Sequence, residues 1–95
     1  MKGYLIARVN VTDPEKYKNY VALSPAAIAA FGGKFLTRGG NVETLEGEKE
    51  TNRMVVVEFE SLEIARQFYH SEQYTIAKAE RAGAAEGQFI IVEGI

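Results

Sequence analysis

Arg38 stands directly before a glycine pair, in the stretch TRGGNVETLEGE at residues 37–48. A phosphate-binding loop would need further glycines and a lysine at fixed spacing before a helix. RNA-binding RGG segments are repeated, whereas this chain has one copy. A glycine pair inside a strand pattern most often marks a bulge that bends the strand. Two interpretations follow: a structural bulge with a solvated Arg38, or a bend that turns Arg38 inward, where a desolvated charge needs a partner or a ligand.

Two further charged residues, Arg8 and Glu58, lie in segments rich in strand-forming residues. Glu58 has two interpretations. Paired with Arg8 or Arg38, it forms a buried structural ion pair. Unpaired in an apolar pocket, it is suited to act as a general base.

The stretch YHSEQY, residues 69–74, contains two tyrosines and the only histidine. His70 is either a surface residue at a helix end or a proton shuttle. One imidazole does not make a metal site, because metal centres usually need three or more ligands. Tyr69 and Tyr74 are either core aromatics or residues whose rings pack while their hydroxyls reach a cleft. No nucleotide fingerprint or serine–histidine–acid order is present, and we expect no cofactor.

The length, net charge and composition of the chain limit the class of protein. Ninety-five residues make one domain, covering 1–95. A net charge of −2 does not indicate the positively charged surface that binds nucleic acid or anionic lipid. No apolar run approaches the length of a membrane span. The absence of cysteine excludes disulfides and thiolate sites and fits a reducing compartment. We expect a soluble, cytoplasmic protein.

The elements that must position these residues follow from periodicity and caps. Strands are predicted at 4–11, 34–38, 53–60 and 88–92, with extended chain at 41–46 and a polar turn at 47–52. A first helix begins at Thr12 or Asp13 and ends at Gly32-Gly33, with a kink or fresh start at Pro25. A second begins at Ser61 and restarts at Ser71. The order β-α-β-β-α-β predicts an α+β, ferredoxin-like fold: a four-stranded antiparallel sheet with two helices on one face.

Two helices cover only one face of such a sheet. The two-residue period of strands separates the side chains into two sets. One set is apolar and should meet the helices: Leu5, Ala7, Val9, Val11, Val55, Val57 and Phe59. The other holds Tyr4, Ile6, Met54 and Val56 beside Arg8, Asn10, Glu58 and Glu60. Strands that are apolar on both sides need both faces covered. We therefore predict a homodimer through the helix-free sheet face; the alternative is a monomer with a hydrophobic ligand groove there.

With these segments placed, the chain resembles the domain of unknown function 1330 family, within the dimeric α+β barrel superfamily. The resemblance rests on GYLIARVNVTDPEKY, GGKFLTRGG with LEGE, VVVEFES followed by ARQFY and SEQY, and the closing IVEG. It covers nearly the whole chain and implies a ferredoxin-like dimer. The positions that match the family pattern are Arg38, Gly39, Gly40, Glu58, Phe59, Ser61, Tyr69, Ser71 and Tyr74. The chain departs from that pattern at Glu60, Phe68 and Glu72-Gln73, and His70 is not a signature residue.

The resemblance implies no settled activity. Relatives in the superfamily include cofactor-free monooxygenases, muconolactone-type isomerases and haem proteins. We expect a dimer that binds a small carbonyl, phenolic or carboxylate compound, and that could be a cofactor-independent enzyme. Arg38 would anchor the anionic oxygen with help from Arg8, Glu58 or His70 would move the proton, and Tyr69 and Tyr74 would line the cleft. The alternatives are a non-catalytic binding or stress-response dimer, and a haem or metal protein, which the single imidazole disfavours.

Overall fold

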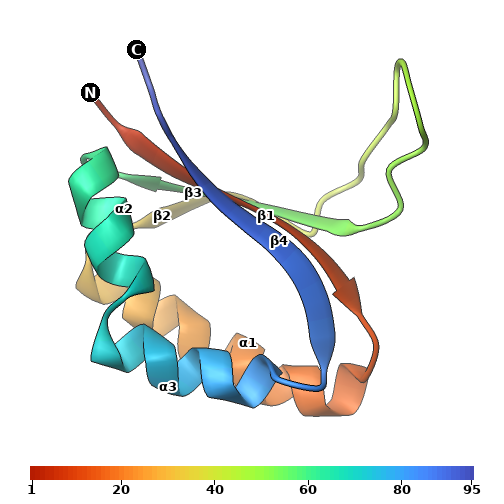
Figure 1. The fold of residues 1–95 in the computed structure, drawn as a ribbon, viewed down its shortest axis with the longest axis horizontal. Coiled ribbons are helices and arrows are strands. Elements are labelled where there is room, and N and C mark those ends of the chain that lie inside the picture. Colours follow the sequence, from red (N-terminus) through yellow and green to blue (C-terminus); the bar gives the residue numbers. More distant parts are fainter.

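The computed structural model describes residues 1–95 and confirms the predicted element order, with the second helix divided in two. The elements are β1 (Gly3–Val11), α1 (Pro14–Ala30), β2 (Lys34–Arg38), β3 (Arg53–Phe59), α2 (Leu62–Tyr69), α3 (Glu72–Arg81) and β4 (Ala85–Glu93). The strands form one antiparallel sheet in the order β2-β3-β1-β4, and all helices lie on one side of it (Figure 1). The ferredoxin-like prediction is therefore confirmed.

The helices begin at the polar residues that the sequence marks as caps. Asp13, Ser61 and Ser71 each accept, through a side-chain oxygen, a hydrogen bond of 3.1 Å from the backbone N–H three residues later. Each bond satisfies one of the four amide groups that have no partner at the start of a helix. The break between α2 and α3 at Ser71 is thus a cap that starts a new helix, as predicted.

The structure differs from the prediction at Pro25 and at the start of β4. Helix α1 continues through Pro25 without the fresh start that was one of the two predictions there, although proline supplies no N–H to the helix. Strand β4 begins at Ala85, three residues before the predicted start, because pairing with the long β1 extends to Val11. Residues 41–46 form no strand; the segment 39–52 stands away from the body of the molecule as a long loop (Figure 1).

The core lies between the sheet and the helices. Leu5, Ala7 and Val9 of β1 and Val57 and Phe59 of β3 are buried, so the predicted division of these strands into two faces is correct. Helix α2 lies against the sheet, and its first turn sits directly on β1. A Cβ atom at Gly3 would stand 2.5 Å from the carbonyl oxygen of Ser61, so only glycine permits this approach.

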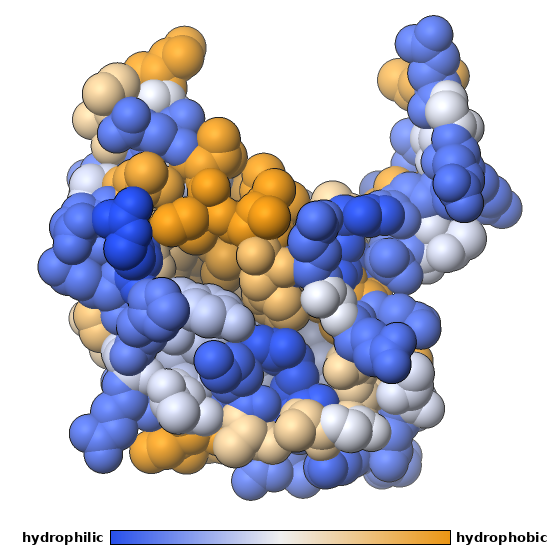
Figure 2. Space-filling view, in the orientation of Figure 1, coloured by the Kyte–Doolittle hydropathy of each residue, from blue (hydrophilic) through white to orange (hydrophobic).

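The other face of the sheet, which we call the open face, carries no helix. Leu36, Ile90 and Val92 are 55%, 47% and 46% exposed there, and Ile6 and Val56 are half-buried. Apolar side chains gather at the base of a hollow between the two chain termini and the 39–52 loop (Figure 2). None of the helices has the length and apolar character needed to cross a lipid bilayer.

Candidate functional site

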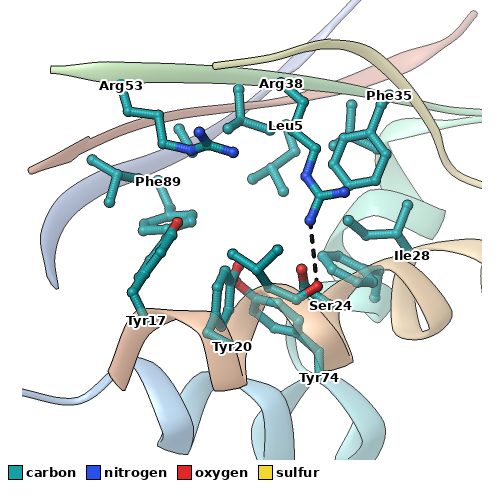
Figure 3. Close-up of a pocket in the computed structure, with 16 residues that line it drawn as sticks. Leu5, Tyr17, Tyr20, Ser24, Ile28, Phe35, Arg38, Arg53, Tyr74 and Phe89 are labelled. Carbon is teal, nitrogen blue, oxygen red and sulfur yellow. Dashed lines mark hydrogen bonds between the residues drawn. The ribbon is translucent and has the colours of Figure 1, made fainter. Parts of the chain in front are cut away.

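A pocket lies between α1 and the sheet. Helix α1 packs along α3, away from the strands, whereas α2 lies closer to them (Figure 1). The space between α1 and the sheet is lined by 16 residues, of which 13 are hydrophobic (Figure 3). The free volume of the pocket is about 30 Å³, which is room for a water molecule or two. The charged side chains of the lining are two arginines, Arg38 and Arg53.

A bulge in β2 turns Arg38 into this pocket. Phe35 pairs with Val57 and Thr37 with Val56, so Leu36 is the extra residue of β2. If Leu36 took a regular place in the pairing, the two-residue period would place Arg38 on the open face. With the bulge, Arg38 pairs with Val55 and shares the helix side. The bulge therefore directs Arg38 toward the helix side, as the inward interpretation expected, but the side chain remains exposed and the extra residue precedes the glycine pair.

The Arg38 side chain lies across the pocket from β2 to α1. Its Cζ is 4.7 Å from the centroid of the Phe35 ring, and its Nη2 donates a hydrogen bond of 3.3 Å to the carbonyl of Val21 (Figure 3). In a regular helix that carbonyl would accept from the N–H of residue 25. Pro25 has no N–H, so the interruption in the helix ladder leaves the Val21 carbonyl available to Arg38. The guanidinium remains exposed at the pocket mouth.

Arg53 enters the pocket from the first position of β3. It pairs with Val9, whose side chain faces the helices, so the side chain of Arg53 lies on the same side of the sheet. Its Nε is buried and has no hydrogen-bond partner. Its guanidinium lies over Gly39, where an added Cβ would be 2.3 Å from Nη1. Burial raises the pKa of Tyr17, and the positive charges of Arg53 and Arg81 partly offset that rise.

Tyrosine hydroxyls form the polar floor of the pocket. Tyr20 and Tyr74 are both buried, and their hydroxyl oxygens are 2.6 Å apart in a hydrogen bond. Burial, and then the neighbouring Tyr74, raises the pKa of Tyr20 well above its usual value. The Tyr20 hydroxyl therefore stays protonated at neutral pH and can donate a hydrogen bond. Ser24, also buried, lies on the same wall of α1.

A third arginine lies behind the tyrosines. The Cζ of Arg81 is 4.1 Å from the ring centroid of Phe89 and 5.4 Å from that of Tyr20. Its Nε and Nη2 are buried without hydrogen-bond partners. The interior beside α1 thus has a positive electrostatic character.

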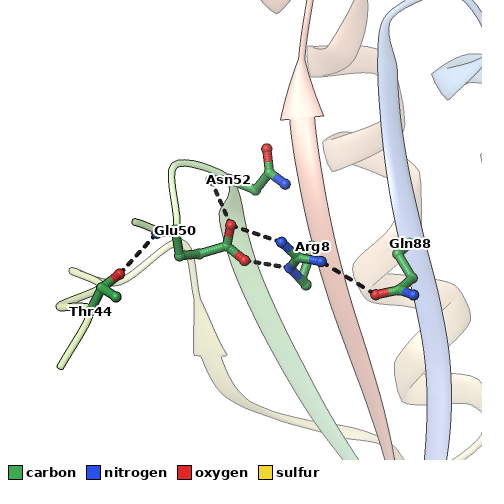
Figure 4. A network of polar contacts seen from close by, with 5 residues as sticks. All are labelled: Arg8, Thr44, Glu50, Asn52 and Gln88. Atoms are coloured by element: carbon green, nitrogen blue, oxygen red, sulfur yellow. Dashed lines mark hydrogen bonds and ion pairs between the residues drawn. The ribbon is translucent and has the colours of Figure 1, made fainter. Parts of the chain in front are cut away.

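The structure places Arg8 elsewhere. Arg8 lies on the open side of the sheet, where Nε and Nη2 bond both carboxylate oxygens of Glu50, the latter at 3.0 Å (Figure 4). Gln88 accepts from Nη1 at 3.5 Å, and Thr44 accepts from the backbone N–H of Glu50 at 2.8 Å. Arg8 therefore fastens the base of the 39–52 loop to the sheet and does not assist Arg38.

Glu58 and His70 are also outside the pocket. Glu58 faces the open side, where the Tyr4 hydroxyl donates to its Oε2 at 3.4 Å. The expected ion pair between Glu58 and Arg8 or Arg38 does not form within the chain, because a β-sheet separates Glu58 from Arg38 and Arg8 pairs with Glu50. His70 is the exposed C-cap of α2, with its ring 5.4 Å from that of Tyr69.

The two tyrosines of YHSEQY have different positions. Tyr74 lines the pocket, as the sequence indicated for one interpretation. Tyr69 is half-buried at the edge of the core, under the Nζ of Lys78 at 4.6 Å from its ring centroid. The structure therefore brings Arg38 and Tyr74 to one pocket, and it places Arg8, Glu58, His70 and Tyr69 outside that pocket's lining.

Several polar pocket residues were missed in the sequence. Arg53 precedes Val55 by two positions, so the same parity that identified the apolar set assigns it to the helix side. Tyr17 and Tyr20 stand three residues apart in the sequence of α1, a spacing that marks a helix face packed on the core and not a binding site. Arg81 carried no sequence signal, since arginine in a last helical turn usually lies in solvent near the helix dipole.

The fold is similar to those of several solved structures. A protein of unknown function from Rhodopseudomonas palustris, RPA0582, aligns with a TM-score of 0.76 and 19% identity over 99% of this chain and 82% of its own. SnoaB, a cofactor-independent oxygenase from Streptomyces nogalater, aligns with a TM-score of 0.69 and 12% identity over 99% and 93%. A dimeric ferredoxin-like protein of unknown function from Bacteroides fragilis gives 0.61 and 16% over 98% and 96%. At these identities the similarity shows the fold alone.

Sequence comparison defines the family. A search among functionally curated proteins finds no match. The model of the family described as "Domain of unknown function (DUF1330)" matches residues 2–95, which include the pocket-lining residues and the open face. The chain therefore belongs to the DUF1330 family.

Proposed function

We propose that this protein binds a small organic anion, with a carboxylate, phenolate or enolate oxygen, in the pocket between α1 and the sheet. The observation that carries the proposal is the composition of the lining, in which aromatic and aliphatic walls surround two arginines and no acidic side chain. Buried positive charges are costly unless an anion or strong acceptors compensate them. Arg38 is the anchor, because its guanidinium is at the mouth and is held only by one carbonyl and one ring.

Ligand entry requires that Arg38 move. The free volume of about 30 Å³ is far below the roughly 300 Å³ or more of pockets that hold organic ligands. Because Arg38 lies across the pocket, its rotation toward the mouth would enlarge the space. The hydrogen bond to Val21 would then be exchanged for one to the ligand.

Replacement of Arg38 tests this proposal. Arg38→Met keeps an unbranched apolar stem but removes the guanidinium and its charge. We expect at least a tenfold loss of benzoate affinity in calorimetry, from the loss of a charged hydrogen bond worth roughly 1.5–3 kcal/mol. The matched control is Arg66→Met, on the surface of α2, where Arg66 pairs with Glu63 at 2.6 Å. Equal benzoate affinity in the two variants would contradict the proposal.

A second candidate function is cofactor-independent oxygenation of a bound phenol or enol. It is favoured by the fold shared with SnoaB and by the presence of Arg38 and tyrosine hydroxyls in one lining, since such donors can stabilise a developing phenolate. Oxygen uptake with a naphthohydroquinone, compared between the wild type and Arg38→Met, tests it. Uptake at the uncatalysed rate for both proteins would leave binding alone as the function.

We propose in addition that two copies pack through their open faces. Leu36, Ile90 and Val92 are about half exposed, so burying what remains of each would contribute roughly 0.7–1.5 kcal/mol, before the cost of association. Solved proteins of similar fold are described as dimeric. The raised 39–52 loop and the termini border the face (Figure 2), so a partner would sit between them.

Substitution on the open face of the edge strand β4 tests the dimer. Ile90→Asp should convert a species of twice 10.5 kDa into one of 10.5 kDa in sedimentation equilibrium. Ile76→Asp is the control, since Ile76 is 59% exposed on α3, on the helix side. A single 10.5 kDa species for the wild type at micromolar concentration would contradict the proposal.

A further inference from the structure

We infer that the ligand of this pocket is a flat dianion whose two acidic groups lie about one helical turn apart, one held by Arg38 and the other by Arg53. This inference rests on the proposed function and names the chemical class of its ligand. Arg53 is not among the residues that the sequence suggested, and nothing in the chain occupies its buried Nε.

The sheet places the two arginines side by side on one face. Arg38 pairs directly with Val55, and Arg53 is two positions earlier on the same strand, β3. Diagonal neighbours of this kind have Cα atoms about 7–8 Å apart. Both side chains therefore extend into the same pocket from adjacent strands, and no acidic side chain of the lining lies between them (Figure 3).

The two guanidinium groups are directed at successive turns of α1. Arg38 bonds the carbonyl of Val21, and the charge of Arg53 acts on the hydroxyl of Tyr17. Four residues of α-helix span about 6 Å. The two oxygens of a single carboxylate are much closer together than that, so one carboxylate would satisfy one arginine and leave the other buried without a partner.

The walls between the arginines select a planar spacer. Rings of Tyr17, Tyr20, Phe35, Phe68, Tyr74 and Phe89 line the pocket. Aromatic rings favour stacked or edge-to-face contact with another flat, unsaturated group. A ligand with two acidic groups would also neutralise both positive charges of the lining, which a monoanion would not.

Three benzene carboxylates test the inference by calorimetry. Terephthalate carries carboxylates at opposite ends of one ring, phthalate carries the same charge at adjacent positions, and benzoate carries one carboxylate. For the wild type we expect terephthalate to bind at least about tenfold more tightly than either of the others, because it gains a second charged hydrogen bond. Arg53→Gln should remove this preference, because the second carboxylate then lacks a charged partner.

The variants also need to be folded. Unfolding midpoints of the wild type and Arg53→Gln provide that check, and Arg53→Lys, which keeps the charge, is a second variant that should retain part of the terephthalate preference. Arg66→Gln is the matched control and should behave as the wild type.

The outcomes separate this inference from the proposed function. Equal binding of terephthalate, phthalate and benzoate, with all three dependent on Arg38, would overturn the dianion inference alone. A terephthalate preference that survives in Arg53→Gln would do the same. Failure of all three compounds to bind the wild type would overturn both.

Discussion

Gly39 gives the sharpest test of the pocket geometry, because its missing side chain makes room for the Arg53 guanidinium. A Cβ at this position would stand 2.3 Å from Nη1 and 2.9 Å from Cζ of Arg53. These distances are well inside van der Waals contact, so Gly39→Ala must displace the guanidinium. Gly32 is the matched control: its φ is 72°, against 71° for Gly39, but a Cβ there would meet no atom within 4 Å.

The expected losses of stability follow from the φ angles and the Cβ contacts of Gly39 and Gly32. Alanine at a left-handed φ costs about 1–2 kcal/mol, and the cost should be similar at Gly39 and Gly32. Displacing the end of a flexible side chain adds little to that cost. We therefore expect both alanine variants to lose about 1–2 kcal/mol of unfolding free energy, or roughly 4–16 °C of midpoint in a domain of this size. Only Gly39→Ala should move the charge of Arg53.

Two measurements separate the effects. Urea unfolding gives the free energies, and an unchanged slope shows that both variants keep the native compactness. The NMR resonance of the Arg53 Nε–H group should shift in Gly39→Ala and not in Gly32→Ala, and terephthalate affinity should fall only in the former. An unmoved Arg53 resonance in Gly39→Ala would refute the placement of this guanidinium over Gly39.

For three other perturbations, the structure predicts whether the unfolding free energy rises or falls. Burial raises the folded-state pKa values of Tyr17 and Tyr20 above the ordinary value of 10.0, so the unfolded chain loses these protons first. The contribution of these groups to the unfolding free energy is therefore fully present below pH 10, and it should fall above pH 10 by up to about 1.4 kcal/mol per pH unit for each group. Urea unfolding at pH 8 to 11 measures this decrease. In Tyr20→Phe the unfolding free energy should depend less steeply on pH. Ser71→Ala should cost about 1 kcal/mol in the same assay at neutral pH, since it removes the cap of α3. Pro25→Ala should raise the unfolding free energy by about 1–3 kcal/mol, because it supplies the missing helix N–H; a decrease would show that Pro25 is needed for the packing of α1.

The layered architecture was predictable from the sequence because its signals are local. Alternation along β1 and β3 identified the buried set, and the hydroxyl and carboxylate caps identified the helix starts. The continuous α1 was not predictable, since Pro25 disfavours a helix locally and the packing of α1 on α3 outweighs that preference.

The site was predictable only in part, because its geometry depends on contacts distant in sequence. The glycine pair correctly drew attention to Arg38, but a bulge can form at residues of any type, and Leu36 carries no mark of one. The partner of Arg8 is Glu50, 42 residues away on a loop whose path no periodicity describes. Arg53 could have been assigned to the helix side from its two-residue spacing to Val55, but an arginine next to a polar turn carries no other sign of a pocket position.

The extra residue in β2 has a consequence for how the two faces of the sheet can change independently. Deleting Leu36 alone would remove the bulge and leave Thr37 opposite Val56 and Arg38 opposite Val55, so Arg38 would stay on the helix side. The pocket would keep both of its cations, and the surface proposed to meet a second copy would lose an apolar side chain that is 55% exposed. A one-codon deletion could therefore weaken the proposed assembly and leave ligand recognition in place.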